Sequence, residues 1–165
     1  MRWLALTLVL SSSIGRADGV HATSDSQPTR TLVYVEALGK AGAYGVGVER
    51  PITPRLALGG AVSWIALRGQ QIATVSPYLH ATLVRRGNHA LFGELGAVLV
   101  HSKIVSPVAS WDGMSDTGGG GVAGLGWERG GKRFVFRAQG SVLVGEGGVA
   151  PWLGLAIGVK PGAFR

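Results

Sequence analysis

Beyond residue 30, the chain divides into short segments in which apolar residues alternate with small or polar ones. In one of them, apolar residues or glycine occupy every second position from Phe134 to Val144, and Arg137, Gln139 and Ser141 lie between them. Such a period of two is typical of β-strands that have two unlike faces. The pattern predicts eight strands, at residues 31–38, 43–49, 55–67, 72–84, 89–100, 119–128, 133–144 and 150–160.

The number and length of these segments indicate a fold class. Several contain about 12 residues, and a tilted strand needs roughly 9–11 residues to cross a bilayer. Eight is an even number and the smallest in common use for membrane barrels. We therefore predict an all-β fold, an eight-stranded antiparallel up-and-down transmembrane β-barrel, over residues 31–165.

The distribution of charge over the two faces predicts which face points outward. The apolar face carries almost no charge, whereas the small and polar face carries Glu36, Glu94 and Arg137. An arginine or lysine on the lipid face costs about 2–4 kcal/mol at the bilayer midplane. A barrel with an apolar exterior and a narrow lumen filled by side chains avoids this cost, whereas a soluble barrel would carry polar residues outside.

The connections between the predicted strands alternate in character. Residues 49–55, 85–89 and 128–133 form compact charged turns. The other connections are 39–42, 68–71, 101–118 and 145–149, of which 101–118 is the longest. With the N-terminus inside, the charged turns face the periplasm and the long loop lies outside, as in membrane barrels.

The N-terminus has the layout of a secretory signal peptide. Arg2 provides a positive start, an apolar run over 3–10 follows, and small-residue cleavage sites end at Ala17 or Ala22. We predict a signal peptide over residues 1–22 and a short polar segment over 23–30; the alternative is a first strand or a buried helix. The absence of cysteine excludes lipoprotein processing, disulfides and thiol chemistry.

Composition supports an exported β-protein that meets lipid. Hydrophobic residues make up 46% of the chain, mean hydropathy is +0.28, and 28 glycines are spread through apolar segments. No apolar run is long enough for a transmembrane helix. The net charge of +7 falls to +6 when residues 1–22 are removed. The phosphate groups of lipids are anions that can attract this positive charge.

We expect outer-membrane lipid and lipopolysaccharide as partners, and no nucleic acid. We also expect the protein to be a monomer.

One set of residues is predicted to form a polar network inside the barrel. Its members are Glu36, Glu94, Arg137, Tyr78 and His80. Buried charges must pair, so we interpret the set as a salt-bridged plug that closes the barrel. The alternative interpretation is a proton or ion pathway, or a binding site.

Motifs for catalysis are weak. Asp116-Thr117-Gly118 matches the aspartic-protease tripeptide but has no second copy, and the Gly-x-Gly patterns at 45–47 and 124–126 open no helix. His101 and Ser102 suggest a lipid hydrolase, but adjacent strand residues point to opposite faces. The histidines have no metal-ligand spacing. We therefore predict no catalytic, cofactor or metal site.

Five aromatic residues near the segment ends are predicted to form girdles at the membrane interfaces. They are Trp64, Trp127, Trp152, Tyr34 and Tyr44.

The stretch from Thr31 to Lys160 resembles the small eight-stranded outer-membrane barrels of the OmpA/OmpX-like group. The alternating segments, the charged turns and the segment Trp152–Val159 carry this resemblance. It implies insertion by the outer-membrane assembly machinery. Members usually end on an aromatic residue, whereas here Phe164 is penultimate.

The predicted function is a structural or interaction role in the bacterial outer membrane, without catalysis. The loop 101–118 is the expected contact surface, through Trp111 and the apolar stretch 104–108. Two alternatives stay open: a lipid A-modifying hydrolase, and a soluble periplasmic barrel that binds lipid.

Overall fold

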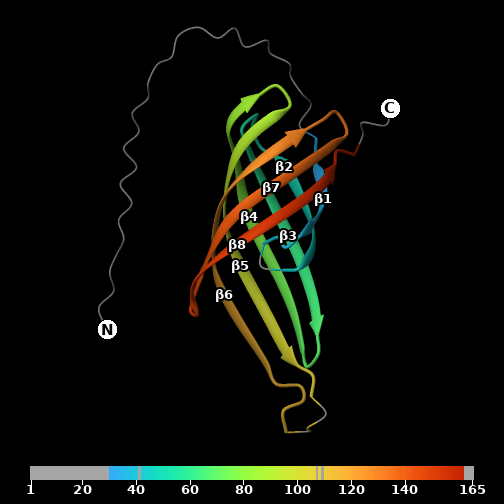
Figure 1. Ribbon diagram of the computed structural model, residues 1–165, viewed down its shortest axis with the longest axis vertical. Helices are drawn as coiled ribbons and strands as arrows, with labels where there is room; N and C mark the ends of the chain where they lie inside the picture. The colour runs from blue at the N-terminus through green and yellow to red at the C-terminus, as the bar shows by residue number, and fades with distance from the viewer. Residues whose placement is uncertain (1–29, 41, 107, 109, 162–165) are drawn as a thin grey trace, which may run out of the picture.

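The computed structural model describes residues 30–40, 42–106, 108 and 110–161, and its strands close into one antiparallel barrel in which each strand pairs with its neighbours in sequence (Figure 1). The strands are β1 (Leu32–Ala37), β2 (Tyr44–Pro51), β3 (Leu56–Leu67), β4 (Gln70–Arg86), β5 (His89–Ile104), β6 (Ser115–Gly130), β7 (Phe134–Gly145) and β8 (Gly148–Val159). β1 pairs with β8 and closes the ring. The predicted eight-stranded up-and-down fold is confirmed. The predicted signal peptide 1–22, the polar segment up to residue 29, and Phe164 lie outside the described residues.

The alternation of the sequence decides which side chains enter the barrel. In β1, Leu32, Tyr34 and Glu36 are buried, whereas Val33 and Val35 are exposed. The same alternation runs through the other strands. Within the described part of the chain, no helix is long and apolar enough to cross a membrane.

The connection predicted over 101–118 is much shorter in the structure. β5 continues to Ile104 and β6 begins at Ser115, with Lys103 opposite Ser115. The polar residues and glycines at these strand ends have no alternating pattern, so the sequence did not indicate strands there. Pairing between β6 and β7 starts only at Gly120, and the β5–β6 hairpin runs on past the tip of the β7–β8 hairpin (Figure 1). The loop itself spans 105–114.

Glycines make room for the large aromatic side chains of the interior. A Cβ atom on Gly47 would overlap the ring of Tyr34, and a Cβ atom on Gly59 would overlap the ring of Tyr78. Phe92 is fully buried. Small residues at inward positions are therefore required by the packing of a narrow barrel.

A proline interrupts the ladder between β4 and β5. Pro77 has no N–H to donate, and the strand pairing skips from Val75–Leu99 to Tyr78–Gly96. The hydroxyl of Ser76 donates a hydrogen bond to the carbonyl oxygen of Ala97 at 3.0 Å. This side-chain bond replaces a bond that the proline cannot make.

We expect Ser76→Ala to lower the free energy of unfolding by about 1–2 kcal/mol, because the carbonyl of Ala97 loses its donor in the barrel wall. Equilibrium urea unfolding of the refolded barrel measures this change. Ser63→Ala is the matched control, since the buried hydroxyl of Ser63 has no partner among the described residues. Equal losses in the two variants would contradict the role assigned to Ser76.

Candidate functional site: the interior ion-pair network

All five residues predicted for the interior network lie inside the barrel. Glu36, Tyr78, His80, Glu94 and Arg137 are each no more than 7% exposed. They are contributed by β1, β4, β5 and β7, so the network joins distant parts of the sequence. Glu36 and Glu94, however, are not the ion-pair partners of Arg137.

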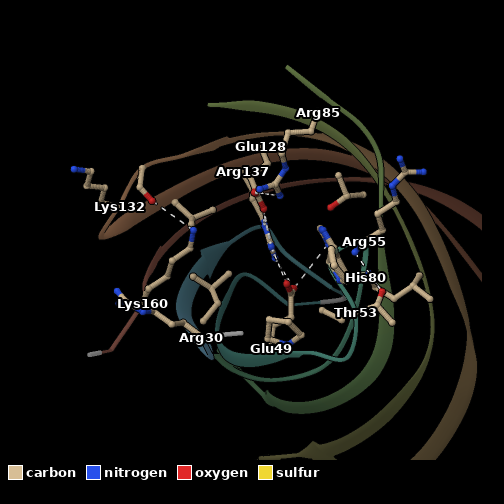
Figure 2. Close-up of a pocket in the computed structure, with 18 of the residues that line it drawn as sticks. Arg30, Glu49, Thr53, Arg55, His80, Arg85, Glu128, Lys132, Arg137 and Lys160 are labelled. Carbon is tan, nitrogen blue, oxygen red and sulfur yellow. Dashed lines mark hydrogen bonds and ion pairs between the residues drawn. The ribbon is translucent and has the colours of Figure 1, made fainter. Parts of the chain in front are cut away.

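Arg137 is held by two carboxylates, Glu49 and Glu128, which lie where predicted strands meet charged turns. Its Nη1 and Nη2 donate to the two oxygens of Glu49 at 2.7 and 2.9 Å, and its Nε donates to Glu128 Oε2 at 2.8 Å. The guanidinium also lies over the ring of Phe92, 5.4 Å from the ring centroid. Figure 2 shows Arg137 between Glu128 and Glu49. This is the two-pronged geometry that guanidinium and carboxylate groups favour.

Glu36 and Glu94 instead share a lysine from the β1–β2 turn. Lys40 Nζ lies 3.0 Å from Glu94 and 3.6 Å from Glu36. It also lies 4.1 Å from the centroid of the Tyr78 ring, a cation–π contact. Lys40 is only 4% exposed, although its backbone belongs to a turn. The turn therefore folds its cation into the lumen.

The tyrosines and His80 connect the two clusters. The hydroxyls of Tyr34 and Tyr78 lie 2.8 Å apart, and Tyr78 donates to Glu49 Oε2 at 3.3 Å. His80 Nδ1 lies 3.3 Å from Glu94 and 3.8 Å from Glu49, between the carboxylates of both clusters. Its ring also stacks on a buried phenylalanine at 4.7 Å. The result is one continuous polar network across the barrel.

The electrostatics of Lys40 follow from its partners. Burial of the ammonium lowers its pKa, but the carboxylate of Glu94, with Tyr34 and Glu36, outweighs burial and raises the pKa above the ordinary lysine value. Lys40 is therefore charged at neutral pH. It neutralises part of the negative charge that the buried carboxylates place inside the barrel.

Three members of the network offer possible metal ligands. One atom each of Glu49, His80 and Glu94 lies within 4.8 Å of the others. Both oxygens of Glu49 already accept from Arg137, and Glu94 contacts Lys40. A metal ion would have to displace two fixed cations, so the donor set suits internal ion pairs rather than a metal centre.

At the end of the barrel that carries the β2–β3, β4–β5 and β6–β7 turns, a cavity of about 760 Å³ adjoins the network (Figure 2). Glu49, His80, Glu128 and Arg137 line its inner part. Basic residues of the turns and strand ends surround it. We call this cavity the basic mouth.

The other residues considered for catalysis do not come together in the structure. His101 Nδ1 contacts the hydroxyl of Thr117 at 2.9 Å on the exposed surface. Ser102 is opposite Asp116 in the register and lies on the other face of β5. Asp116 accepts a hydrogen bond from the backbone N–H of Thr117. No described contact joins His101 to Ser102 and Asp116 as a catalytic set.

The aromatic residues divide into two groups, and two predictions for them were wrong. Tyr34 is 3% exposed and faces the lumen, so it is not part of a girdle. Trp152 donates its indole N–H to the carbonyl oxygen of Gly39 at 2.8 Å and is half-buried. Both occupy inward positions of the strand alternation. The large exposed surfaces of Tyr44, Trp64 and Trp127 agree with outward positions.

Sequence reasoning missed Lys40, Glu49 and Glu128. Glu49 follows the outward residues Val46 and Val48, and its position in that alternation indicates an inward side chain. Glu128 has the same signal in β6. Lys40 lies in a turn without periodicity, so no pattern in the sequence places it inside.

Comparisons with known proteins identify the fold. No protein-family model matches the chain, and no curated protein sequence matches it significantly. The attachment invasion locus protein Ail of Yersinia pestis is similar in structure at 13% identity and a TM-score of 0.55, over 80% of this chain and 96% of that chain. Ail has the same match in complex with the heparin analogue sucrose octasulfate. The N-terminal β-barrel domain of Pseudomonas aeruginosa OprF matches at 17% identity and a TM-score of 0.57, over 79% and 95% of the two chains. The fold of this chain is that of the small eight-stranded barrels of the OmpA/OmpX-like group.

Proposed function

We propose that the chain is a bacterial outer-membrane β-barrel protein that has a structural or interaction role, no catalytic activity and a lumen closed by its own side chains. The observation that carries this proposal is that the outer face of the barrel wall is apolar and the inner face is polar, the reverse of a water-soluble barrel. Outward positions hold exposed apolar residues on all strands, and the buried positions hold the charged network. Lipid is the solvent that such a surface suits.

The exposed surface is apolar to a degree that is unusual for a water-soluble barrel. Leu95 is 66% exposed, Leu125 is 62% exposed and Leu153 is 73% exposed, on three different strands. Outer-membrane lipid and lipopolysaccharide are the partners expected for this surface. The fold resemblance supports insertion by the outer-membrane assembly machinery, and we expect the inserted barrel to be a monomer.

The interior argues against the alternative of a soluble lipid-binding barrel. A lipocalin-like protein needs an apolar cavity for its ligand. Here the middle of the lumen holds ion pairs, and the cavity at one end is lined by charged groups. The separation of His101 from Ser102 and Asp116 likewise gives no support to a lipid A hydrolase.

The proposed contact surface outside the membrane is the loop 105–114. Its described residues include Val108, Trp111 and Met114, which are 50%, 61% and 56% exposed. Backbone hydrogen bonds from Trp111 and Asp112 to the carbonyl oxygen of Val108 give the loop a defined turn. Lipopolysaccharide or a partner protein can pack against these apolar side chains.

Leu95→Arg tests the membrane location. In lipid vesicles, we expect an arginine at this exposed position in the middle of β5 to lower the free energy of unfolding by about 2–4 kcal/mol. Gln71→Arg, at the exposed start of β4, is the control and should cost no more than about 1 kcal/mol, because it lies near the interface. Equal, small effects would indicate that the outer face meets water. Recovery of the wild-type protein from the soluble fraction of cells, instead of the outer-membrane pellet, would reject the location directly.

A further inference from the structure

The basic mouth is lined by more basic than acidic side chains, even without Arg137 of the internal network. The basic side chains around it are contributed by turns and strand ends on several sides of the barrel. They are Arg30, Arg55, Arg85, Lys132, Arg133 and Lys160. The carboxylates that line the same cavity are Glu49 and Glu128. Arg137 is hydrogen-bonded to both, and Arg85 Nη2 lies 3.8 Å from Glu128 Oε1.

The positions of the basic residues follow the inward register of the strands. Arg30 precedes buried Leu32 by two residues, and Arg55 precedes buried Ala57 by two. A spacing of two keeps side chains on one face of an extended chain. Arg85 is adjacent in the ladder to buried Ala90. The cations of the mouth therefore come from turns and strand ends at several points around the barrel, and only Lys132 and Arg133 are neighbours in one turn.

Two further observations indicate that the electrostatic potential in the basic mouth is positive. Burial lowers the pKa of Lys160 below the ordinary lysine value, and the cations Arg85 and Arg137 lower it further, against the opposing effect of Glu128. Figure 2 shows Lys160 and Arg85 on different sides of the cavity, with the Lys160 ammonium donating to the carbonyl oxygen of Gly131 at 3.4 Å. The opposite end of the barrel shows no such excess among the described residues, because Asp112, Asp116 and Glu146 lie there together with Arg68 and Lys103.

We propose that the basic mouth binds a ligand that carries several phosphate groups. Arginine side chains form paired hydrogen bonds with phosphate oxygens, and lysine adds a point charge. Because the mouth is open to solvent, salt screens each ion pair and one pair alone contributes little. A single phosphate cannot reach cations on several sides of a cavity of about 760 Å³, whereas a ligand with phosphates on several sides can. This binding site goes beyond the structural role proposed above and does not depend on it.

Titration calorimetry with tripolyphosphate, on the barrel refolded in a neutral detergent at low salt, tests the site. The variant Arg55→Gln/Lys160→Gln removes two cations from the mouth. The control Arg50→Gln/Arg129→Gln removes the same charge from exposed residues in β2 and β6 near the same end. We expect at least a tenfold loss of affinity in the mouth variant and less than a twofold change in the control.

A second mouth variant, Arg55→Gln/Arg85→Gln, guards against misfolding of the first, and heat-modifiable gel migration verifies folding. Equal losses of affinity in the mouth and control variants would indicate that positive charge spread over the surface binds the ligand, and would overturn the proposal. A wild-type barrel that does not bind tripolyphosphate would also overturn it.

A competition experiment distinguishes two sources of phosphate. Displacement of tripolyphosphate by cardiolipin vesicles, in which each headgroup carries two phosphates, but not by phosphatidylcholine vesicles, identifies a lipid headgroup. Binding without such displacement identifies a soluble polyphosphate.

Discussion

Replacement of Arg137 by methionine is expected to lower the free energy of unfolding by about 3–5 kcal/mol, which is the usual cost of removing one partner from a buried ion pair. The guanidinium is 5% exposed and donates to both Glu49 and Glu128. Its loss leaves two carboxylates next to each other inside the barrel. Urea unfolding in lipid vesicles, followed by tryptophan fluorescence and by gel migration without heating, measures the change.

Two further variants distinguish the effect of losing the ion pairs from the effect of changing the volume of the side chain. Arg50→Met, at an exposed position near the same end, should change stability by less than about 0.5 kcal/mol. Adding Glu49→Gln and Glu128→Gln to Arg137→Met should restore most of the loss, because no buried charge is then left without a partner. A single-variant loss below about 1 kcal/mol, or a triple variant weaker than the single one, would show that the network does not hold the barrel closed.

The sequence predicts the fold more fully than the network because the two depend on different signals. The alternation in β7, which sets Phe134 and Phe136 outside and Arg137 inside, repeats along each strand and determines the faces of the sheet. A closed barrel with an apolar exterior follows from that repeated pattern. Individual contacts inside it depend on how far one strand is shifted along the next, which no periodicity records.

The partners of Arg137 illustrate this limit. Glu36, Glu94 and Arg137 are all inward, as their positions in the alternation indicate, but they lie at different depths in the lumen. The register places Glu128 directly opposite Arg137, and strand tilt brings Glu49 from across the barrel. Glu49 and Glu128 lie close to charged turns, so the sequence alone suggested solvent-exposed turn residues.

Turn residues that enter the lumen are the hardest to predict. Lys40 and the carbonyl of Gly39, which accepts from Trp152, both belong to the β1–β2 turn. Turns carry no alternation, and a lysine in a turn is usually solvated. The same reasoning explains the error for Trp152, whose position near a strand end suggested the membrane interface. Its inward register, rather than its distance from the end of the strand, decides its environment.

We expect Lys40→Met to lower the free energy of unfolding by about 3 kcal/mol or more, although the substitution keeps an unbranched apolar side chain in the lumen. The ammonium is the cation that contacts both Glu36 and Glu94, and it lies over the Tyr78 ring. Without it, the carboxylates of Glu36 and Glu94 are buried in the lumen without the lysine that they share. Urea unfolding in lipid vesicles again measures the change, and Lys103→Met, at an exposed position in β5, is the matched control.

The pH dependence of this loss distinguishes the ion pair from packing. Because Glu94 raises the pKa of Lys40 above 10.5 in the folded barrel, the stabilisation by Lys40 is fully present below that value and is lost as the pH rises through the raised pKa. The difference between wild type and Lys40→Met should therefore be constant from pH 7 to pH 9 and decrease only at higher pH. A difference of equal size at every pH, including above the raised pKa, would assign the effect to packing of the lysine side chain. A variant as stable as the wild type at neutral pH would exclude Lys40 as the cation that joins β1 to β5.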